Sequence, residues 1–114
     1  MAQVRWSWLA ERDLSLLFDW LERHRGPTHA ADATIAIARA VAQAAENPEL
    51  YAWVGSIHAS LAVAPRNVRR VLAGRSRYIV YYRWLADRNE IQILCIRGGA
   101  QRAPTVEELV REDG

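Results

Sequence analysis

The chain has 114 residues, of which 51% are hydrophobic and 25% are charged, and this composition is typical of one globular domain. The single cysteine excludes an intramolecular disulfide and a cysteine-based zinc cluster, and no apolar run is long enough to span a membrane. The sequence therefore predicts one cytoplasmic domain over residues 1–114, with 103–114 as a C-terminal extension and with no metal or other cofactor.

The net charge of +2 is distributed unevenly along the chain. All basic residues are arginine, and no acidic residue lies between Glu49 and Asp87. Six arginines fall in this acid-free stretch: Arg66, Arg69, Arg70, Arg75, Arg77 and Arg83. Such a stretch indicates a surface for nucleic acid or for an acidic protein partner.

The first part of the chain is predicted to form a strand and then a helix. Alternation over residues 3–9 puts Val4, Trp6 and Trp8 on one side of a half-buried strand. The period changes over residues 11–24, where apolar residues recur at helical spacing: Leu14, Leu17, Phe18 and Leu21. Gly26 and Pro27 then end the helix.

A second helix is predicted over residues 28–46, with Thr28 as its N-cap and with Asn47 and Pro48 at its end. Its expected apolar face consists of small residues, which leave a shallow groove: Ile35, Ala38, Ala42 and Ala45, with Val41 beside them. Two helices joined by so short a turn form an αα-hairpin.

The second half of the chain is predicted to be mostly β-structure. Residues 49–66 show no clear period and are expected to form a long connection with one short strand. Three strands follow, over 67–72, 77–84 and 90–97, and their short connections require antiparallel pairing. Thr105 and Glu108 have the spacing of a capping box, which predicts a short terminal helix.

These elements predict an α+β domain: an N-terminal strand, an α-helical hairpin and a three-strand antiparallel meander, with the helices packed on one face of the sheet. The other face is expected to be open.

Strand periodicity assigns side chains to these two faces. On the strand over 77–84, Tyr78 and Tyr82 are expected to face the core, and Tyr81 the opposite side, which makes Tyr81 the candidate functional tyrosine. Cys95 is expected in the core, on the same side as Ile91 and Ile93.

The element order and two stretches of sequence resemble the RelE/ParE superfamily of toxins from type II toxin–antitoxin systems. Residues 67–83 carry paired arginines, a Gly74-Arg75 turn and a tyrosine-rich strand. Residues 91–100 form a strand leading into Gly99-Ala100, similar to the His-Gly-Ala-Arg ending of ParE-like members. Here Gly98 and Gln101 stand where those members often have histidine and arginine. The likeness covers residues 3–102 and is closer to the ParE-like branch.

The resemblance implies a toxin that inhibits growth by binding DNA gyrase. It also implies a cognate antitoxin, with an acidic or amphipathic C-terminal segment, that neutralises the toxin in a hetero-oligomer. The target- or antitoxin-binding surface would then be supplied by basic residues and one tyrosine: Arg69, Arg70, Arg75, Arg77, Tyr81, Arg83, Arg97 and Arg102.

Two alternatives stay open within the superfamily. The RelE branch cleaves messenger RNA in the ribosome, and this reaction needs a general base, a general acid and cations on the phosphate. The chain has no lysine, no histidine after His58 and no tyrosine after Tyr82, and arginine stays charged at useful pH. No catalytic residue is therefore assigned. The second alternative is an inactive relative that keeps only antitoxin binding.

Overall fold

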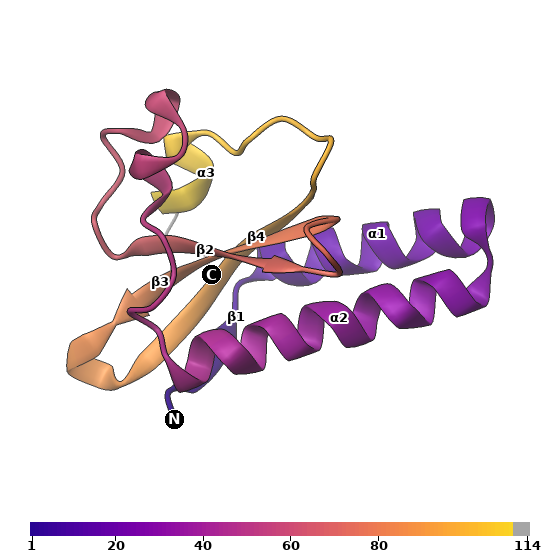
Figure 1. Cartoon of the computed structure of the whole chain (residues 1–114), viewed down its shortest axis with the longest axis horizontal. Coiled ribbons are helices and arrows are strands. Elements are labelled where there is room, and N and C mark those ends of the chain that lie inside the picture. The colour runs from indigo at the N-terminus through magenta and orange to yellow at the C-terminus, as the bar shows by residue number, and fades with distance from the viewer. Residues whose placement is uncertain (111–114) are drawn as a thin grey trace.

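The computed structural model describes residues 1–110 and confirms the predicted α+β class (Figure 1). The helices and strands follow the expected order: β1 (Gln3–Trp6), α1 (Trp8–Arg25), α2 (Pro27–Glu46), β2 (Val68–Ala73), β3 (Tyr78–Leu85), β4 (Glu90–Gly98) and α3 (Val106–Val110). Short 3-10 turns lie between α2 and β2 and between β3 and β4. None of the helices in this described part is long and apolar enough to cross a membrane.

The sheet has the strand order β1-β4-β3-β2. The last three strands pair antiparallel as predicted, whereas β1 pairs parallel with β4. Helices α1 and α2 lie side by side across one face of this sheet (Figure 1). The main core fills the space between them, with Ile37 and Val41 from α2 packing against Val80 and Ile93 from the sheet.

The first strand is shorter than predicted, because Ser7 ends it and caps α1. The Ser7 hydroxyl accepts a hydrogen bond from the Ala10 N–H at 3.0 Å and donates to the Leu94 carbonyl at 3.0 Å. Trp8 therefore belongs to the first turn of α1 and is 57% exposed instead of facing the core. The alternation that predicted a strand over 3–9 was wrong beyond Trp6.

The second helix begins one residue earlier than predicted. Gly26, at φ 93°, is its N-cap, and Pro27 occupies the first helical position, so Thr28 is not the cap. The expected buried face was right for Val41 and Ala45, which are buried, and wrong for Ile35, which is exposed while Ile37 is buried. The rest of the inward face was not predicted: Ala30, Ala33, Ala40 and Ala44. With alanine on nearly every side of this helix, the apolar pattern did not select one face.

The second face of the sheet is covered, which corrects the expectation that it would be open. The segment between α2 and β2 and the short helix α3 lie across it (Figure 1). Within that segment the Trp53 ring donates from Nε1 to the Pro65 carbonyl at 3.0 Å, and the Arg66 guanidinium lies 4.0 Å from the ring centroid. A second apolar cluster fills the space beneath: Val54, Leu61, Ala64, Val68, Tyr81, Leu94, Cys95 and Leu109.

A register shift between β3 and β4 explains one further error. The pairing moves by one residue at Tyr81 and Tyr82, so that Tyr81 pairs with Cys95 but Tyr82 pairs with Ile93. Ile93 therefore faces the helices, whereas Cys95 is buried in the cluster on the other face. Simple alternation had placed both on the same side.

Candidate functional site

The turn between β2 and β3 and the end of β4 meet at one end of the sheet, where β3 begins. The Gly99 N–H donates a hydrogen bond to the Arg77 carbonyl at 2.7 Å. A Cβ on Gly99 would lie 2.9 Å from the Ser76 carbonyl oxygen, so this close approach requires glycine. The side chains of Arg75 and Arg77 are exposed on the turn, and Arg102 is exposed on the segment that follows β4. We call these three residues the basic tip.

The turn holds its backbone in an unusual conformation. Gly74, Arg75 and Ser76 have consecutive positive φ angles of 59°, 58° and 69°. Glycine adopts this region freely, but arginine and serine do so at a cost of about 1 kcal/mol each. The turn therefore presents two arginines from a backbone that is held by its contacts with Gly99.

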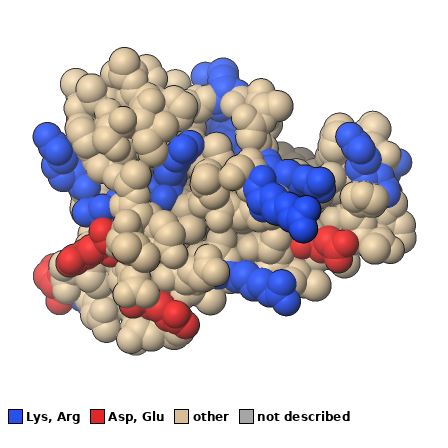
Figure 2. Space-filling model, in the orientation of Figure 1, with Lys and Arg blue, Asp and Glu red and all other residues tan. Residues whose placement is uncertain are grey.

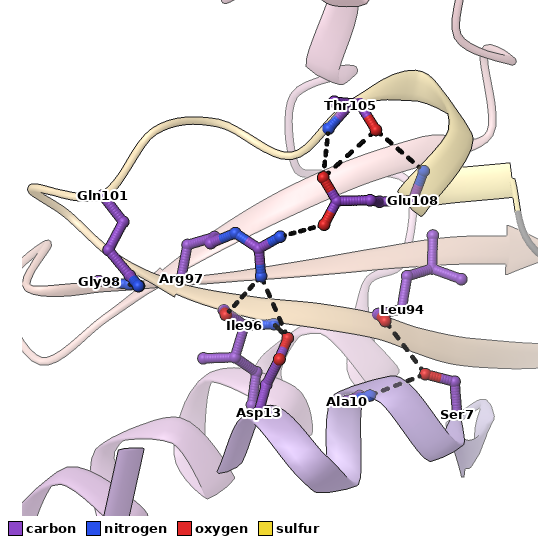
Figure 3. Close-up of polar contacts among 10 residues, drawn as sticks. All are labelled: Ser7, Ala10, Asp13, Leu94, Ile96, Arg97, Gly98, Gln101, Thr105 and Glu108. Carbon is purple, nitrogen blue, oxygen red and sulfur yellow. Dashed lines mark hydrogen bonds and ion pairs between the residues drawn. The ribbon is translucent and has the colours of Figure 1, made fainter. Parts of the chain in front are cut away.

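Arg97, on β4, connects three elements through its guanidinium group (Figure 3). Its Nη1 donates to Asp13 Oδ2 of α1 at 3.2 Å, and its Nη2 donates to Glu108 Oε2 of α3 at 2.5 Å. Asp13 Oδ2 also accepts the Ile96 N–H at 3.0 Å. The predicted capping box closes the arrangement, since the Thr105 N–H donates to Glu108 Oε1 at 3.1 Å. Arg97 is therefore enclosed by carboxylates instead of being presented to a partner.

The pKa values of the two carboxyl groups beside Arg97 are shifted in opposite directions. Burial is the main influence on Asp13 and raises its pKa above the ordinary 3.8, against the Ile96 hydrogen bond and the Arg97 charge. Burial also opposes ionisation of Glu108, but the hydrogen bonds from Thr105 and the charge of Arg97 outweigh it and lower the pKa of Glu108 below 4.5. Glu108 is thus the better stabilised anion of the pair.

The end of β4 is closed by Gln101. The Gly98 N–H donates to Gln101 Oε1 at 2.6 Å, and the Gln101 N–H donates to the Gly98 carbonyl at 3.0 Å (Figure 3). These two residues stand where the family resemblance implies histidine and arginine. Here they form a local turn.

The other predicted site residues are engaged inside the fold. Arg69 Nη1 donates to the Tyr51 carbonyl at 2.5 Å, and Arg83 Nη2 donates to the Leu109 carbonyl at 3.2 Å. Tyr81 lies on the expected side of β3 but is only 1% exposed. Burial raises its pKa, and a hydrogen bond from Arg70 only partly offsets this. The predicted exposed tyrosine was wrong because the face on which it lies is covered.

An apolar groove lies between α1 and the end of β4, next to Arg97. It has a volume of about 540 Å³ and is lined by residues of α1, of β4 and of the segment after β4: Asp13, Leu16, Leu17, Trp20, Ile96, Arg97, Ala100 and Gln101. Leu16 is 56% exposed and Trp20 is 46% exposed. Sequence reasoning missed this groove, although Leu16 and Trp20 lie outside the predicted apolar stripe of α1 and thus pointed to a second apolar face.

The charge and the side-chain types at this site suit a binding surface. On the face shown in Figure 2, arginines form separate patches over the upper and central surface, and most acidic side chains lie at the lower left. Two side chains that could take part in chemistry are buried: Tyr81 lies inside the second cluster, and burial raises the pKa of the Cys95 thiol to about 12. The basic tip and the groove together offer arginines, an aromatic ring and aliphatic side chains, which are typical of interface centres.

Comparison with known proteins agrees with this architecture. The sequence profile of the family described as "ParE toxin of type II toxin-antitoxin system, parDE" matches residues 4–103. A solved structure described as "Chromosomal ParDE TA system from P. aeruginosa" superimposes with a TM-score of 0.66 at 24% identity, covering 86% of this chain and 96% of that one. At this identity the likeness shows the fold alone. No curated protein sequence gives a significant match.

Proposed function

Because this chain belongs to the ParE toxin family of type II toxin–antitoxin systems, we propose that it inhibits bacterial growth by binding DNA gyrase in the cytoplasm. A cognate antitoxin neutralises it by forming a hetero-oligomer. Membership of the family establishes the class of toxin. The target, DNA gyrase, and neutralisation by an antitoxin are what we propose.

One observation carries the choice of a binding function. Arg75 and Arg77 are exposed on a turn whose backbone is fixed by Gly99, and no acidic residue lies in the sequence between Glu49 and Asp87. Exposed arginines on an ordered backbone suit the recognition of an acidic surface, because a backbone that is already ordered loses less conformational entropy on binding. This part of the protein offers cations for binding but no group suited to general acid–base catalysis.

Inducible expression in a bacterial host tests the proposal. We expect growth arrest together with accumulation of covalent gyrase–DNA cleavage complexes, and we expect co-expression of the neighbouring antitoxin gene to restore growth. The double variant R75A/R77A should lose most of the gyrase effect. The matched control R88A removes an exposed arginine from the turn between β3 and β4 and should stay toxic.

Other outcomes would redirect the assignment. Messenger cleavage in translating ribosomes without gyrase trapping would identify a RelE-like endonuclease. Absence of any growth effect would identify an inactive relative. The double variant G98H/Q101R, which restores the residues often found in ParE-like members, should then be tested for a gain of toxicity.

A further inference from the structure

The C-terminal segment 104–110 packs on the sheet through side chains of the short helix α3 and of the residues before it. Its helix α3 spans only five residues, and the chain that leads to it is exposed from Gly99 to Arg102. A helix this short is not stable by itself, so its contacts with the sheet hold it in place. The family match ends at residue 103, and this segment therefore lies beyond the part of the chain that the family shares.

Apolar and polar contacts hold the segment on the sheet: Pro104 is buried, and Val106 packs against the second apolar cluster. Leu109 is fully buried in the second apolar cluster, with Tyr81 and Cys95. Glu108 pairs with Arg97 at 2.5 Å, and the Leu109 carbonyl accepts a hydrogen bond from Arg83 at 3.2 Å. The surface under the segment thus has an apolar centre and two arginines at its rim. In the folded chain this surface is occupied by the carboxylate of Glu108 and the side chain of Leu109.

We propose that residues 104–110 act as a clasp that opens while the rest of the fold stays intact, and that the uncovered surface binds a partner segment presenting a carboxylate directly followed by leucine. Arg97 keeps its ion pair with Asp13 when the clasp opens, so its position is preserved for the incoming carboxylate. The leucine enters the space left by Leu109. This inference concerns the chain's own C-terminal segment and does not depend on the gyrase assignment.

The single cysteine of the chain reports on this opening directly. Cys95 is fully buried in the same cluster as Leu109, so iodoacetamide reaches its thiol only when that cluster opens. The labelling rate of the folded full-length chain therefore measures the open fraction. The urea dependence of an opening free energy scales with the surface that the opening exposes. Opening of the clasp exposes little surface, so the labelling rate should be almost independent of urea at low urea concentrations.

Two variants, E108Q and L109A, and the control E107Q identify what keeps the clasp closed. E108Q removes the charge that pairs with Arg97 and should accelerate labelling about tenfold, since charge-assisted hydrogen bonds are among the stronger ones. E107Q makes the same chemical change at the exposed neighbouring position and should leave the rate unchanged. L109A should accelerate labelling independently of the ion pair. Labelling that follows the urea dependence of global unfolding, or equal rates in E107Q and E108Q, would overturn the clasp.

A synthetic peptide tests the docking surface. The peptide has the sequence of residues 103–110 and is added to full-length E108Q, whose clasp opens more often. It should slow the labelling of Cys95 in a concentration-dependent manner. The same peptide with glutamine in place of Glu108 should have a much weaker effect. If the acidic peptide gives no protection at millimolar concentration, the surface is not a docking site for such a segment.

Discussion

Gly99 lies against the carbonyl oxygen of Ser76, so close that a Cβ on Gly99 would be 2.9 Å from that oxygen. The same glycine donates its N–H to the Arg77 carbonyl. The end of β4 therefore fixes the conformation of the turn that presents Arg75 and Arg77. Steric crowding against Ser76 is therefore enough to explain why this position holds glycine, without any contact with a partner.

The variant G99A tests this relationship. Backbone must move to accommodate the added methyl group, and we expect a loss of about 1–3 kcal/mol in the free energy of unfolding, measured by urea denaturation. G98A is the matched control, because its nearest neighbour would be the flexible Gln101 side chain at 3.4 Å. Equal destabilisation by the two variants would show that the contact with Ser76 does not constrain the turn.

The fold was largely predictable because its signals are local. Helical spacing predicted α1, short connections predicted the antiparallel meander, and the spacing of Thr105 and Glu108 predicted the cap of α3. The errors arose where local pattern carries little information. An alanine-rich helix does not define one face, and a register shift at Tyr81 cannot be read from alternation.

The candidate site was less predictable because its contacts are long-range. Arg97 pairs with Asp13, which is 84 positions away in the sequence, and nothing local to either residue predicts the pair. The buried position of Tyr81 depends on the segment between α2 and β2, whose sequence shows no clear period. By contrast, Arg75 and Arg77 flank a turn and are exposed, so their availability followed from local structure.

The variant S7A tests the junction of β1 and α1. Ser7 caps the helix and also donates to the Leu94 carbonyl, and it is buried. We expect a loss of about 1–2 kcal/mol in the free energy of unfolding, because both the cap and a buried hydrogen bond disappear. S15A, at an exposed position of the same helix, should change stability far less. A similar loss in both variants would argue against a specific role for the Ser7 cap.

The raised pKa of Asp13 predicts a pH dependence of stability. Burial is its main cause, so the folded state binds a proton more tightly at Asp13 than the unfolded chain does. The resulting stabilisation is present at low pH and is lost as the pH rises through the raised pKa. We therefore expect the wild-type chain to gain stability relative to D13N as the pH falls from about 7 to about 4. Carbon-detected NMR titration should independently place the Asp13 midpoint above 3.8, and a lower midpoint would contradict the prediction.

The basic tip should contribute to binding of the antitoxin. Charge reversal in R77E should weaken the purified toxin–antitoxin complex more than R23E, which reverses an exposed arginine near the end of α1. Arg70 is unsuitable for this test, because its hydrogen bond to the buried Tyr81 would confound folding with binding. Arg12 is unsuitable as a control, because its guanidinium lies 5.3 Å from the ring centroid of Trp8.

The salt dependence of the complex distinguishes a charge effect from a change in shape. If the basic tip meets acidic residues of the antitoxin, the association rate should fall as salt is added, and R77E should flatten this dependence. R23E should retain the wild-type slope. Equal weakening by R77E and R23E, with equal salt slopes, would show that the antitoxin is recognised elsewhere, and the apolar groove of Leu16 and Trp20 would then be the next surface to test.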